Sequence, residues 1–577
     1  MTDVTAATLK TPDAGEVKTE EIGLLLVHGM GEQKSLEHLR NSAKELASFI
    51  AATPGLIRLS IIDDLSTSQT IVADATFAHD GAEERVRLHL HEAWWADLGI
   101  SGGLTEQVKF WLWGLGQWAA KVVREGNPGR NTMRTMAMPG FGARGGAMDE
   151  AGFFRQLPSR ALLVGAALLA IFTFFTWSAA KQIVKLLSNA LPEPSLIFLF
   201  LGDVKIYEQD GSPGCGSMFD PGHPMRTTIR RRIVSKMALV ASKNYDRWYM
   251  FAHSLGTIPA FNALQEIELT LPNYLTEEEW NALPQDFKTS APFVSDPKDP
   301  PTTENMMPRR PPWLKDSDGV DRRKLFERFQ GFVTYGSPLD KFAALWPRVV
   351  CLNRQAAVFP TKCEWVNLHD PTDPVSARLD AYKAPSNQAD KVEDGKVADR
   401  IVLEPKNFAS RSSLMFGVSH ICYFRPRAKA PTSMPAAIVG AIVSCGRNKL
   451  SEEAAKAAMP AAESVLRALA AAVQLAAVGA ALMLAAAALL LQIGQLLPHQ
   501  AVIWVKAVFD VVRPGLFEIL QAGGWAAMLA AAAILFVLAV LAIAISGLAR
   551  IRLDARRRRE RQKREAERKR LLAEIQG

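Results

Sequence analysis

Hydrophobic and polar residues recur along the first 450 positions with the spacings of strands and helices that follow one another. The apolar run 22–27 ends in a glycine-rich segment at 28–31, which is typical of a buried parallel strand entering a turn. A helical pattern covers 35–52, and polar and apolar residues alternate over 85–91, as in a half-buried strand. Similar patterns predict strands at 248–251, 331–335 and 364–368, and a helix from 255 to about 267. This succession predicts an α/β sheet with crossover helices.

Several stretches lack this periodicity and are expected to be insertions. Residues 124–152 are rich in Gly, Arg and Met, and residues 290–323 are rich in Pro and charge, so each is predicted to form a loop or a lid. Residues 384–399 are predicted as a shorter polar loop. The alanine-rich residues 451–462 are predicted as a helix.

Three runs contain no Asp, Glu, Lys or Arg, at 161–180, 468–505 and 519–549. Because about 20 apolar residues span a bilayer, the last two predict a transmembrane hairpin, with spans within 468–497 and 522–548. The strands at 22–27 and 248–251 are expected in one sheet, so the chain between them must cross a bilayer an even number of times. We therefore expect 161–180 to form a re-entrant or in-plane helix.

Composition alone describes an ordinary chain of 577 residues, with 48% hydrophobic and 22% charged residues and a net charge of +8. The charge is concentrated at one end, because residues 550–577 hold ten Arg and two Lys against five acids, a net of +7. The near-neutral body argues against nucleic acid as a partner. By the positive-inside rule the tail is expected on the cytosolic side, where its cations can attract anionic headgroups, although a solvated charged helix has the same composition.

The start of the chain and its cysteines exclude further classes. Residues 1–21 are polar and lack a charged start followed by an apolar stretch, so no cleaved signal peptide is expected and the body is expected in the cytosol. Five scattered cysteines without CxxC spacing are typical of reduced structural thiols. Gly29 and Gly31 do not form a phosphate loop, because no Gly-Lys-Ser/Thr follows. We expect no cofactor and no metal.

The segment 248–257 is the most informative part of the chain. An apolar strand is followed by Ala-His-Ser-Leu-Gly at 252–256 and then by an apolar helix. A nucleophile on a sharp strand-to-helix turn needs small residues two positions before and after it, and Ala252 and Gly256 meet that need around Ser254. The helix that follows points its N-terminal amides at an oxyanion formed during attack. Ser254 is thus a candidate nucleophile.

A serine nucleophile needs a base, and the base needs an orienting acid. Downstream of Ser254, a predicted strand ends in an acid-rich loop with Asp370 and Asp373. After Asp373 the only histidines are His420 and His499, and His499 lies between two predicted spans. His420 is therefore the candidate base.

At this point the sequence resembles the α/β-hydrolase superfamily, in particular its membrane-associated lipases and esterases. The resemblance rests on five segments and covers roughly 20–430: Val-His-Gly-Met-Gly-Glu-Gln at 27–33, Ala-His-Ser-Leu-Gly at 252–256, Thr-Tyr-Gly-Ser-Pro-Leu at 334–339, the loop 370–375, and Ser-His at 419–420. Alanine stands at 252 where the family usually has glycine. The resemblance implies Ser254 as nucleophile, Asp373 as acid with Asp370 as the alternative, and His420 as base. It also implies an oxyanion hole from the amides of Leu255 and of Met30 or Gly29.

Each of these residues also has a structural interpretation. Ser254 is suited to capping its helix. His420 is suited to a buried structural role. Asp370 and Asp373 each precede a proline, a pattern that favours turns.

The expected organisation has six parts: a leader at 1–20, the hydrolase domain in two pieces at 21–158 and 202–450, a hydrophobic insertion at 159–201, a transmembrane hairpin at 451–549 and a basic tail at 550–577. The expected function is a membrane-anchored serine hydrolase that faces the cytosol and cleaves an acyl ester, most plausibly of a lipid in the bilayer. A hydrolase-fold scaffold without activity and an acyltransferase are the alternatives. The sequence does not indicate an oligomeric state.

Overall fold

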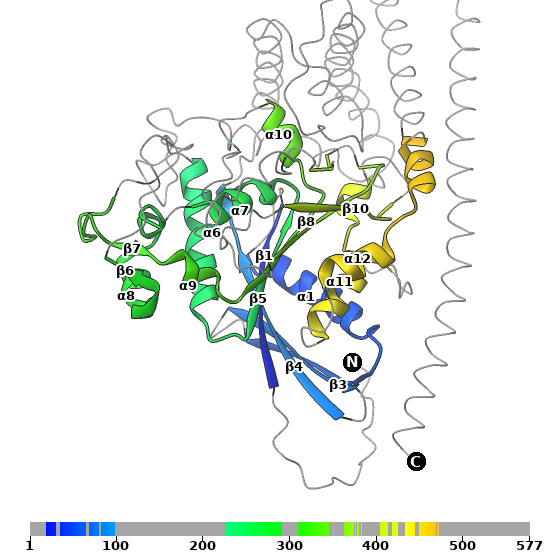
Figure 1. Ribbon diagram of the computed structural model, residues 1–577, viewed down its shortest axis with the longest axis horizontal. Coiled ribbons are helices and arrows are strands. Elements are labelled where there is room, and N and C mark those ends of the chain that lie inside the picture. The colour runs from blue at the N-terminus through cyan, green and yellow to red at the C-terminus, as the bar shows by residue number, and fades with distance from the viewer. Residues whose placement is uncertain are drawn as a thin grey trace, which may run out of the picture.

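The computed structural model describes residues 19–29, 35–64, 69–79, 82–98, 207, 225–266, 268–290, 308, 310–345, 350, 363–373, 375–376, 378–379, 382, 404–413, 418–424, 433–444, 449–468 and 470–471. Within these residues, an eight-stranded mixed sheet forms the centre of the molecule (Figure 1). The strands lie in the order β10-β9-β8-β5-β1-β4-β3-β2. Six consecutive strands, from β10 to β4, run parallel, and β3 and β2 continue the sheet with antiparallel pairs.

The strands of this sheet are β1 (Thr19–Val27), β2 (Leu56–Asp64), β3 (Thr70–His79), β4 (Ala82–Ala93), β5 (Arg247–His253), β8 (Phe329–Tyr335), β9 (Glu364–His369) and β10 (Pro405–Ala409). A separate two-stranded sheet pairs β6 (Lys288–Thr289) with β7 (Gly319–Val320). The helices are α1 (Glu37–Ile50), α6 (Met225–Ser242), α7 (Thr257–Leu264), α8 (Glu277–Ala282), α9 (Arg322–Phe326), α10 (Leu339–Leu345), α11 (Met434–Val443) and α12 (Leu450–Ala457).

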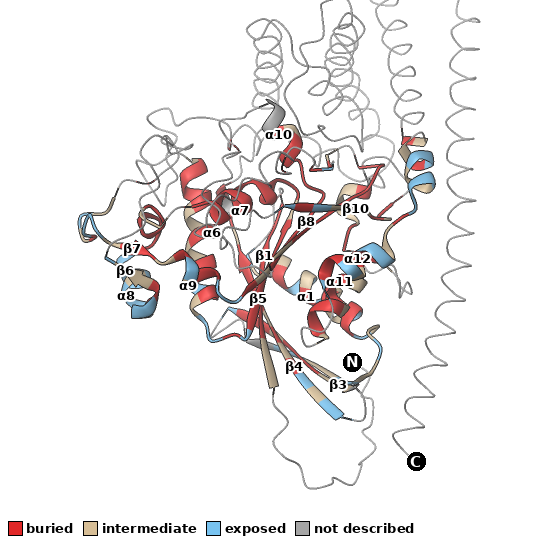
Figure 2. Ribbon diagram, viewed as in Figure 1, coloured by how far each residue is buried: buried red, intermediate tan, exposed pale blue. Residues whose placement is uncertain are grey.

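Helices cover both faces of the sheet because the strands are apolar on both sides. In β1, Leu25 and Val27 pack in one buried cluster with residues of α6, α7 and α9, while Ile22, Leu24 and Leu26 pack in a second cluster with α1, α11 and α12. This division follows from the two-residue period of a strand. Figure 2 shows the buried residues along the central strands and on the helix faces turned toward them. The predicted α/β class is confirmed, as a mostly parallel sheet between two helical layers.

The pairing of β1 with β5 brings together parts of the chain that are far apart in sequence. Val27 lies opposite Ala252, so both strands end at the same edge of the sheet. The two predicted hydrolase-domain pieces, 21–158 and 202–450, therefore contribute neighbouring strands to one sheet. The glycine turn after β1 and the turn after β5 meet at this edge.

Several elements differ from the sequence predictions. The β2–β3 hairpin and α6 were not predicted, and the predicted loop 290–323 ends in β7 and the start of α9. The predicted helix 451–462 is interrupted at 458–460, where α12 ends and a second helical stretch over 461–468 begins. The alternation over 85–91 puts His91 on the polar face of its strand, yet His91 is buried and its ring nitrogen Nε2 lies 2.7 Å from the Tyr245 hydroxyl.

Nearly all residues of the predicted membrane segments lie outside the described part of the chain. The run 161–180, the tail 550–577 and both predicted spans lie outside the described residues, apart from 468, 470 and 471 at the start of the first span. None of the helices within the described ranges has the length and apolar character needed to cross a bilayer.

We predict that Phe332→Ala lowers the free energy of unfolding by about 3–5 kcal/mol, because it opens a cavity in a packed core. Phe332 lies on β8, is fully buried and packs against Trp365. Leu239→Ala is the matched control, because Leu239 is exposed on α6, and it should cost less than about 0.5 kcal/mol. Denaturant unfolding of both full-length variants measures the difference, and equal losses would contradict this account of the core.

Candidate active site

Ser254 occupies a strained turn between β5 and α7. Its φ of 53° lies in the left-handed region, which a side chain disfavours unless its surroundings impose it. The turn η2 (Ser254–Gly256) leads directly into α7. A Cβ on Gly256 would lie 2.1 Å from the carbonyl oxygen of His28, so only glycine permits this approach of β1 and the turn. The predicted need for a small residue at position 256 therefore has a direct steric cause.

A chain of hydroxyl groups supports the backbone of Ser254. The Thr257 hydroxyl donates to the Ser254 carbonyl at 2.7 Å. Because that uses its only proton, the Ser337 hydroxyl, 2.8 Å from Thr257 Oγ1, must be the donor in their contact. The amide of Leu339 in turn donates to Ser337 Oγ at 3.3 Å. The loop after β8 thereby stabilises the strained turn after β5, an arrangement that was not predicted from the sequence.

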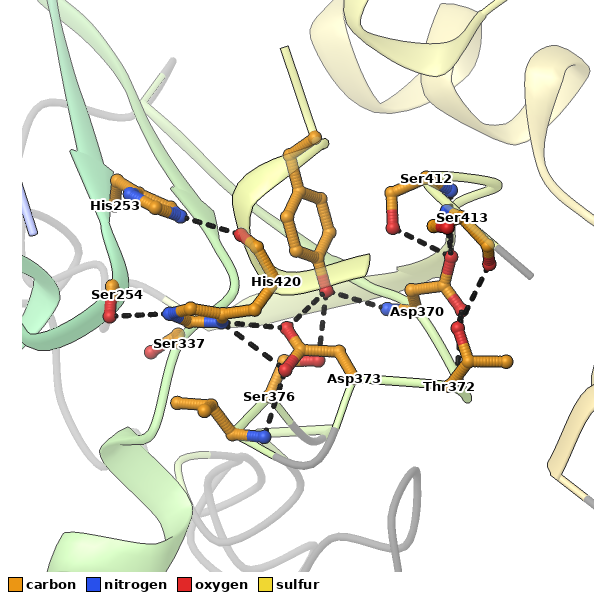
Figure 3. Close-up of polar contacts among 12 residues, drawn as sticks. His253, Ser254, Ser337, Asp370, Thr372, Asp373, Ser376, Ser412, Ser413 and His420 are labelled. Carbon is orange, nitrogen blue, oxygen red and sulfur yellow. Dashed lines mark hydrogen bonds and ion pairs between the residues drawn. The ribbon is translucent and has the colours of Figure 1, made fainter. Parts of the chain in front are cut away.

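His420 links Ser254 to a buried carboxylate (Figure 3). Its Nε2 lies 2.7 Å from Ser254 Oγ, and its Nδ1 lies 3.0 Å from Asp373 Oδ2 and 3.2 Å from Oδ1. A carboxylate only accepts hydrogen bonds, so Nδ1 carries the proton that faces Asp373. Nε2 is then the acceptor that faces the Ser254 hydroxyl. The structure brings together the three residues that the sequence proposed as nucleophile, base and acid.

The carboxylate of Asp373 is ionised despite its complete burial. Burial acts to raise its pKa, but the charge and hydrogen bond of His420, the amide of Val375 and the charge of Lys341 outweigh it and lower the pKa to about 2. The Val375 amide donates to Asp373 Oδ1 at 2.8 Å. Asp373 is therefore a fixed negative charge beside His420 across the neutral pH range.

The alternative acid, Asp370, lies in a different environment. Its carboxylate accepts hydrogen bonds from Thr372, Ser412, Ser413 and Arg467. None of the described contacts joins Asp370 to His420, and Figure 3 shows the two carboxylates directed to different partners. Of the two acids that the sequence left open, the structure places Asp373 against the base.

Tyr423 holds Asp373 in place, a role that no pattern in the sequence indicated. Its hydroxyl donates to Asp373 Oδ2 at 2.9 Å and accepts the amide of Asp370 at 2.8 Å. Because its one proton is committed to Asp373, the Ser376 hydroxyl, 2.9 Å away, must donate to it. Burial raises the pKa of Tyr423 well above its usual value, so the phenol stays protonated.

His253, which immediately precedes Ser254, also holds the base. Its ring stacks between Tyr335 and His420, at centroid distances of 4.8 and 5.1 Å. Its Nε2 lies 3.0 Å from the carbonyl oxygen of His420 and donates to it. Burial lowers the pKa of His253 to about 3, so this imidazole is neutral. Packing and backbone support therefore combine in one side chain.

The candidate oxyanion-hole residues are only partly described. Leu255 follows Ser254 and is buried at the start of the turn. Gly29 lies against Ser254, since a Cβ on Gly29 would approach Ser254 Cβ to 2.6 Å. The carbonyl of Gly29 accepts from His28 Nδ1 at 2.6 Å, while His28 Nε2 accepts the amide of Trp95 at 3.0 Å. Met30 lies outside the described residues.

The site chemistry involves hydroxyl, imidazole and carboxylate groups. Among the residues that the structure describes, no cluster of His, Cys, Asp and Glu side chains has the arrangement needed to hold a metal ion. Cys363 and Cys422 are free thiols.

We predict that Tyr423→Phe lowers the free energy of unfolding by about 1–3 kcal/mol, because it leaves buried partners unsatisfied. It should also slow the labelling of Ser254 by a fluorophosphonate about tenfold, since Asp373 loses a donor that fixes its position. Tyr245→Phe is the matched control, because it removes a buried phenol bonded to His91, remote from Ser254. Similar slowing in both variants would contradict a specific role of Tyr423.

We predict an acid-dependent loss of stability from Asp373. Its folded pKa of about 2 lies below the ordinary 3.8, so its contribution is present above about pH 3.8 and is lost as the pH falls through about 2. The full contribution is about 2 kcal/mol. Unfolding of wild type and Asp373→Asn at pH 4 and pH 2 measures it, and wild type should lose more stability over this interval. Equal losses in the two chains would argue against an ionised Asp373.

Comparison with known proteins does not assign the site to a family. No family model matches the chain, and neither the curated proteins nor the solved structures give a match.

Proposed function

We propose that the chain is a serine hydrolase of the α/β-hydrolase type that cleaves an acyl ester. The observation that carries the proposal is the continuous contact from Ser254 Oγ to His420 at 2.7 Å and from His420 to Asp373 at 3.0 Å. The strained φ of Ser254 at the end of a central parallel strand supports the same conclusion. A helix-capping serine needs neither the imidazole nor the strain.

The proposed reaction proceeds through an acyl-enzyme. His420 Nε2 takes the proton of Ser254 as Oγ attacks the ester carbonyl carbon, and Asp373 stabilises the imidazolium that results. The oxyanion is stabilised by the amide of Leu255 and by an amide of the glycine turn after β1. Collapse of this intermediate expels the alcohol, which takes the proton from His420. Water then attacks the acyl-enzyme with His420 again as base, which releases the acid and restores Ser254.

We infer a lipid ester as the substrate class from the sequence outside the described residues. Two long uncharged runs and a basic tail favour attachment to the cytosolic face of a membrane. An esterase held at that surface meets acyl esters of the bilayer at high local concentration.

We predict that Ser254→Ala abolishes fluorophosphonate labelling and lowers the release of fatty acid from phospholipid vesicles at least about a thousandfold. Ser444→Ala is the matched control, because Ser444 lies at the end of α11 and its hydroxyl donates to the Ala441 carbonyl at 2.8 Å. It should label within about twofold of wild type. Unlabelled wild type in both detergent and vesicles would overturn the proposal, and so would a Ser254→Ala variant with full ester hydrolysis.

A further inference from the structure

The helical stretch 461–468 lies against the loop that carries the candidate acid. This stretch follows α12 and immediately precedes the first uncharged run. Its Arg467 is only 5% exposed, and its Nη1 donates to the Ser413 carbonyl at 3.0 Å and lies 3.3 Å from Asp370 Oδ2. Asp370 itself is fully buried. A cation from the C-terminal part of the chain thus reaches the interior beside the candidate site.

Asp370 fixes the turn that presents Asp373. The amide of Asp373 donates to the Asp370 carbonyl at 2.9 Å, and the amide of Asp370 donates to Tyr423. The Asp370 carboxylate accepts the amide and the hydroxyl of Ser412, each at 2.7 Å, which ties the turn to the loop after β10. A displacement of Asp370 therefore moves the backbone of Asp373 and the phenol that holds its carboxylate.

A second ion pair attaches the same helix without touching Asp370. Arg411 donates to Glu463 through Nε at 2.9 Å and Nη2 at 2.7 Å, in a two-point contact. Glu463 also lies 3.5 Å from Arg467, one turn further along. On the same helix, Val465 and Leu466 are 58% and 66% exposed. The helix therefore directs its charged residues toward the body and leaves two apolar side chains outside.

We propose that Arg467 is a positioning residue. Through Asp370 it couples the helical stretch 461–468 to the three candidate catalytic residues Ser254, His420 and Asp373. The physical reason is that the buried Asp370 carboxylate needs a counter-charge, and Arg467 is the cation within ion-pair distance of it in the described structure. Without that cation the turn 370–373 relaxes, and Asp373 loses its alignment with His420. The uncharged run 468–505 begins at the residue that follows Arg467. A partner that holds this run would therefore also act, through Arg467, on the turn 370–373. This inference rests on the proposed function.

The experiment measures the rate of fluorophosphonate labelling of the full-length chain as a function of pH. Arg467→Gln should slow labelling about tenfold or more and shift the pH of half-maximal rate downward, since an imidazolium without an aligned carboxylate is less stable. Arg467→Lys should be intermediate. Arg411→Gln is the matched control, because Arg411, in the loop after β10, forms the other ion pair that holds this helix, with Glu463. It should stay within about twofold of wild type.

A double mutant separates a direct link from general loosening of the helix. If Arg467 acts through Asp370, Asp370→Asn slows labelling in the same way, and adding Arg467→Gln to it changes the rate by less than about twofold. An unchanged rate and pH midpoint in folded Arg467→Gln overturns the inference, and so does an equal effect of Arg411→Gln. If Arg467→Gln does not yield folded protein, the test rests on Asp370→Asn. A labelling rate and a pH midpoint equal to those of wild type in Asp370→Asn would then overturn the inference.

The same measurements keep this inference apart from the proposed function. If wild type is labelled and Ser254→Ala is not, the result supports the serine hydrolase, regardless of the effect of substitutions at Arg467. Unlabelled wild type overturns the hydrolase, and the role of Arg467 falls with it. A merely structural role of Arg467 would lower the amount of folded chain but would leave the rate and the pH midpoint of the labelled fraction unchanged.

Discussion

The buried carboxylate of Asp373 is the charge on which the candidate site depends. An ionised carboxyl removed from water is tolerated only where donors and positive charge surround it. Here those donors are Val375, two residues after Asp373, and His420 and Tyr423, which lie three residues apart in the segment 418–424. Satisfying this one charge therefore fixes the base, the turn and the tyrosine relative to one another. The orientation of His420 toward Ser254 follows, because its other nitrogen is already committed to Asp373.

The parallel sheet supplies the second constraint, which is the close approach of two turns. Val27 and Ala252 lie opposite each other, so the glycine turn after β1 and the turn after β5 that carries Ser254 lie at the same edge of the sheet. Gly256 has no space for a Cβ against the His28 carbonyl, and Gly29 has none against Ser254. The strain at Ser254 is thus maintained by backbone contacts from β1 and by hydroxyl groups from the loop after β8.

Local patterns predicted the central strands and Ser254, because both are encoded within about ten residues. The resemblance favoured Asp373 as the acid but kept Asp370 as the alternative, since both precede a proline and only the three-dimensional turn determines which of them faces His420. Tyr423 and Arg467 were missed because their partners are distant in sequence and leave no periodic trace. The helix α6 was missed for a related reason. Its Arg226 and Arg230 are buried through contacts with other elements, whereas arginine in a sequence suggests an exposed face.

The single sheet also limits how the chain between β4 and β5 can meet a membrane. Both strands lie beside β1, one on each side, and both run parallel to it. The chain leaves β4 at the edge where Ser254 lies and must return to the opposite edge, through α6, before it enters β5. A segment of this connection that enters a bilayer therefore has to leave it on the same side. The connection therefore begins at the edge of the sheet that carries Ser254, after Ala93, and ends at the opposite edge, before Arg247.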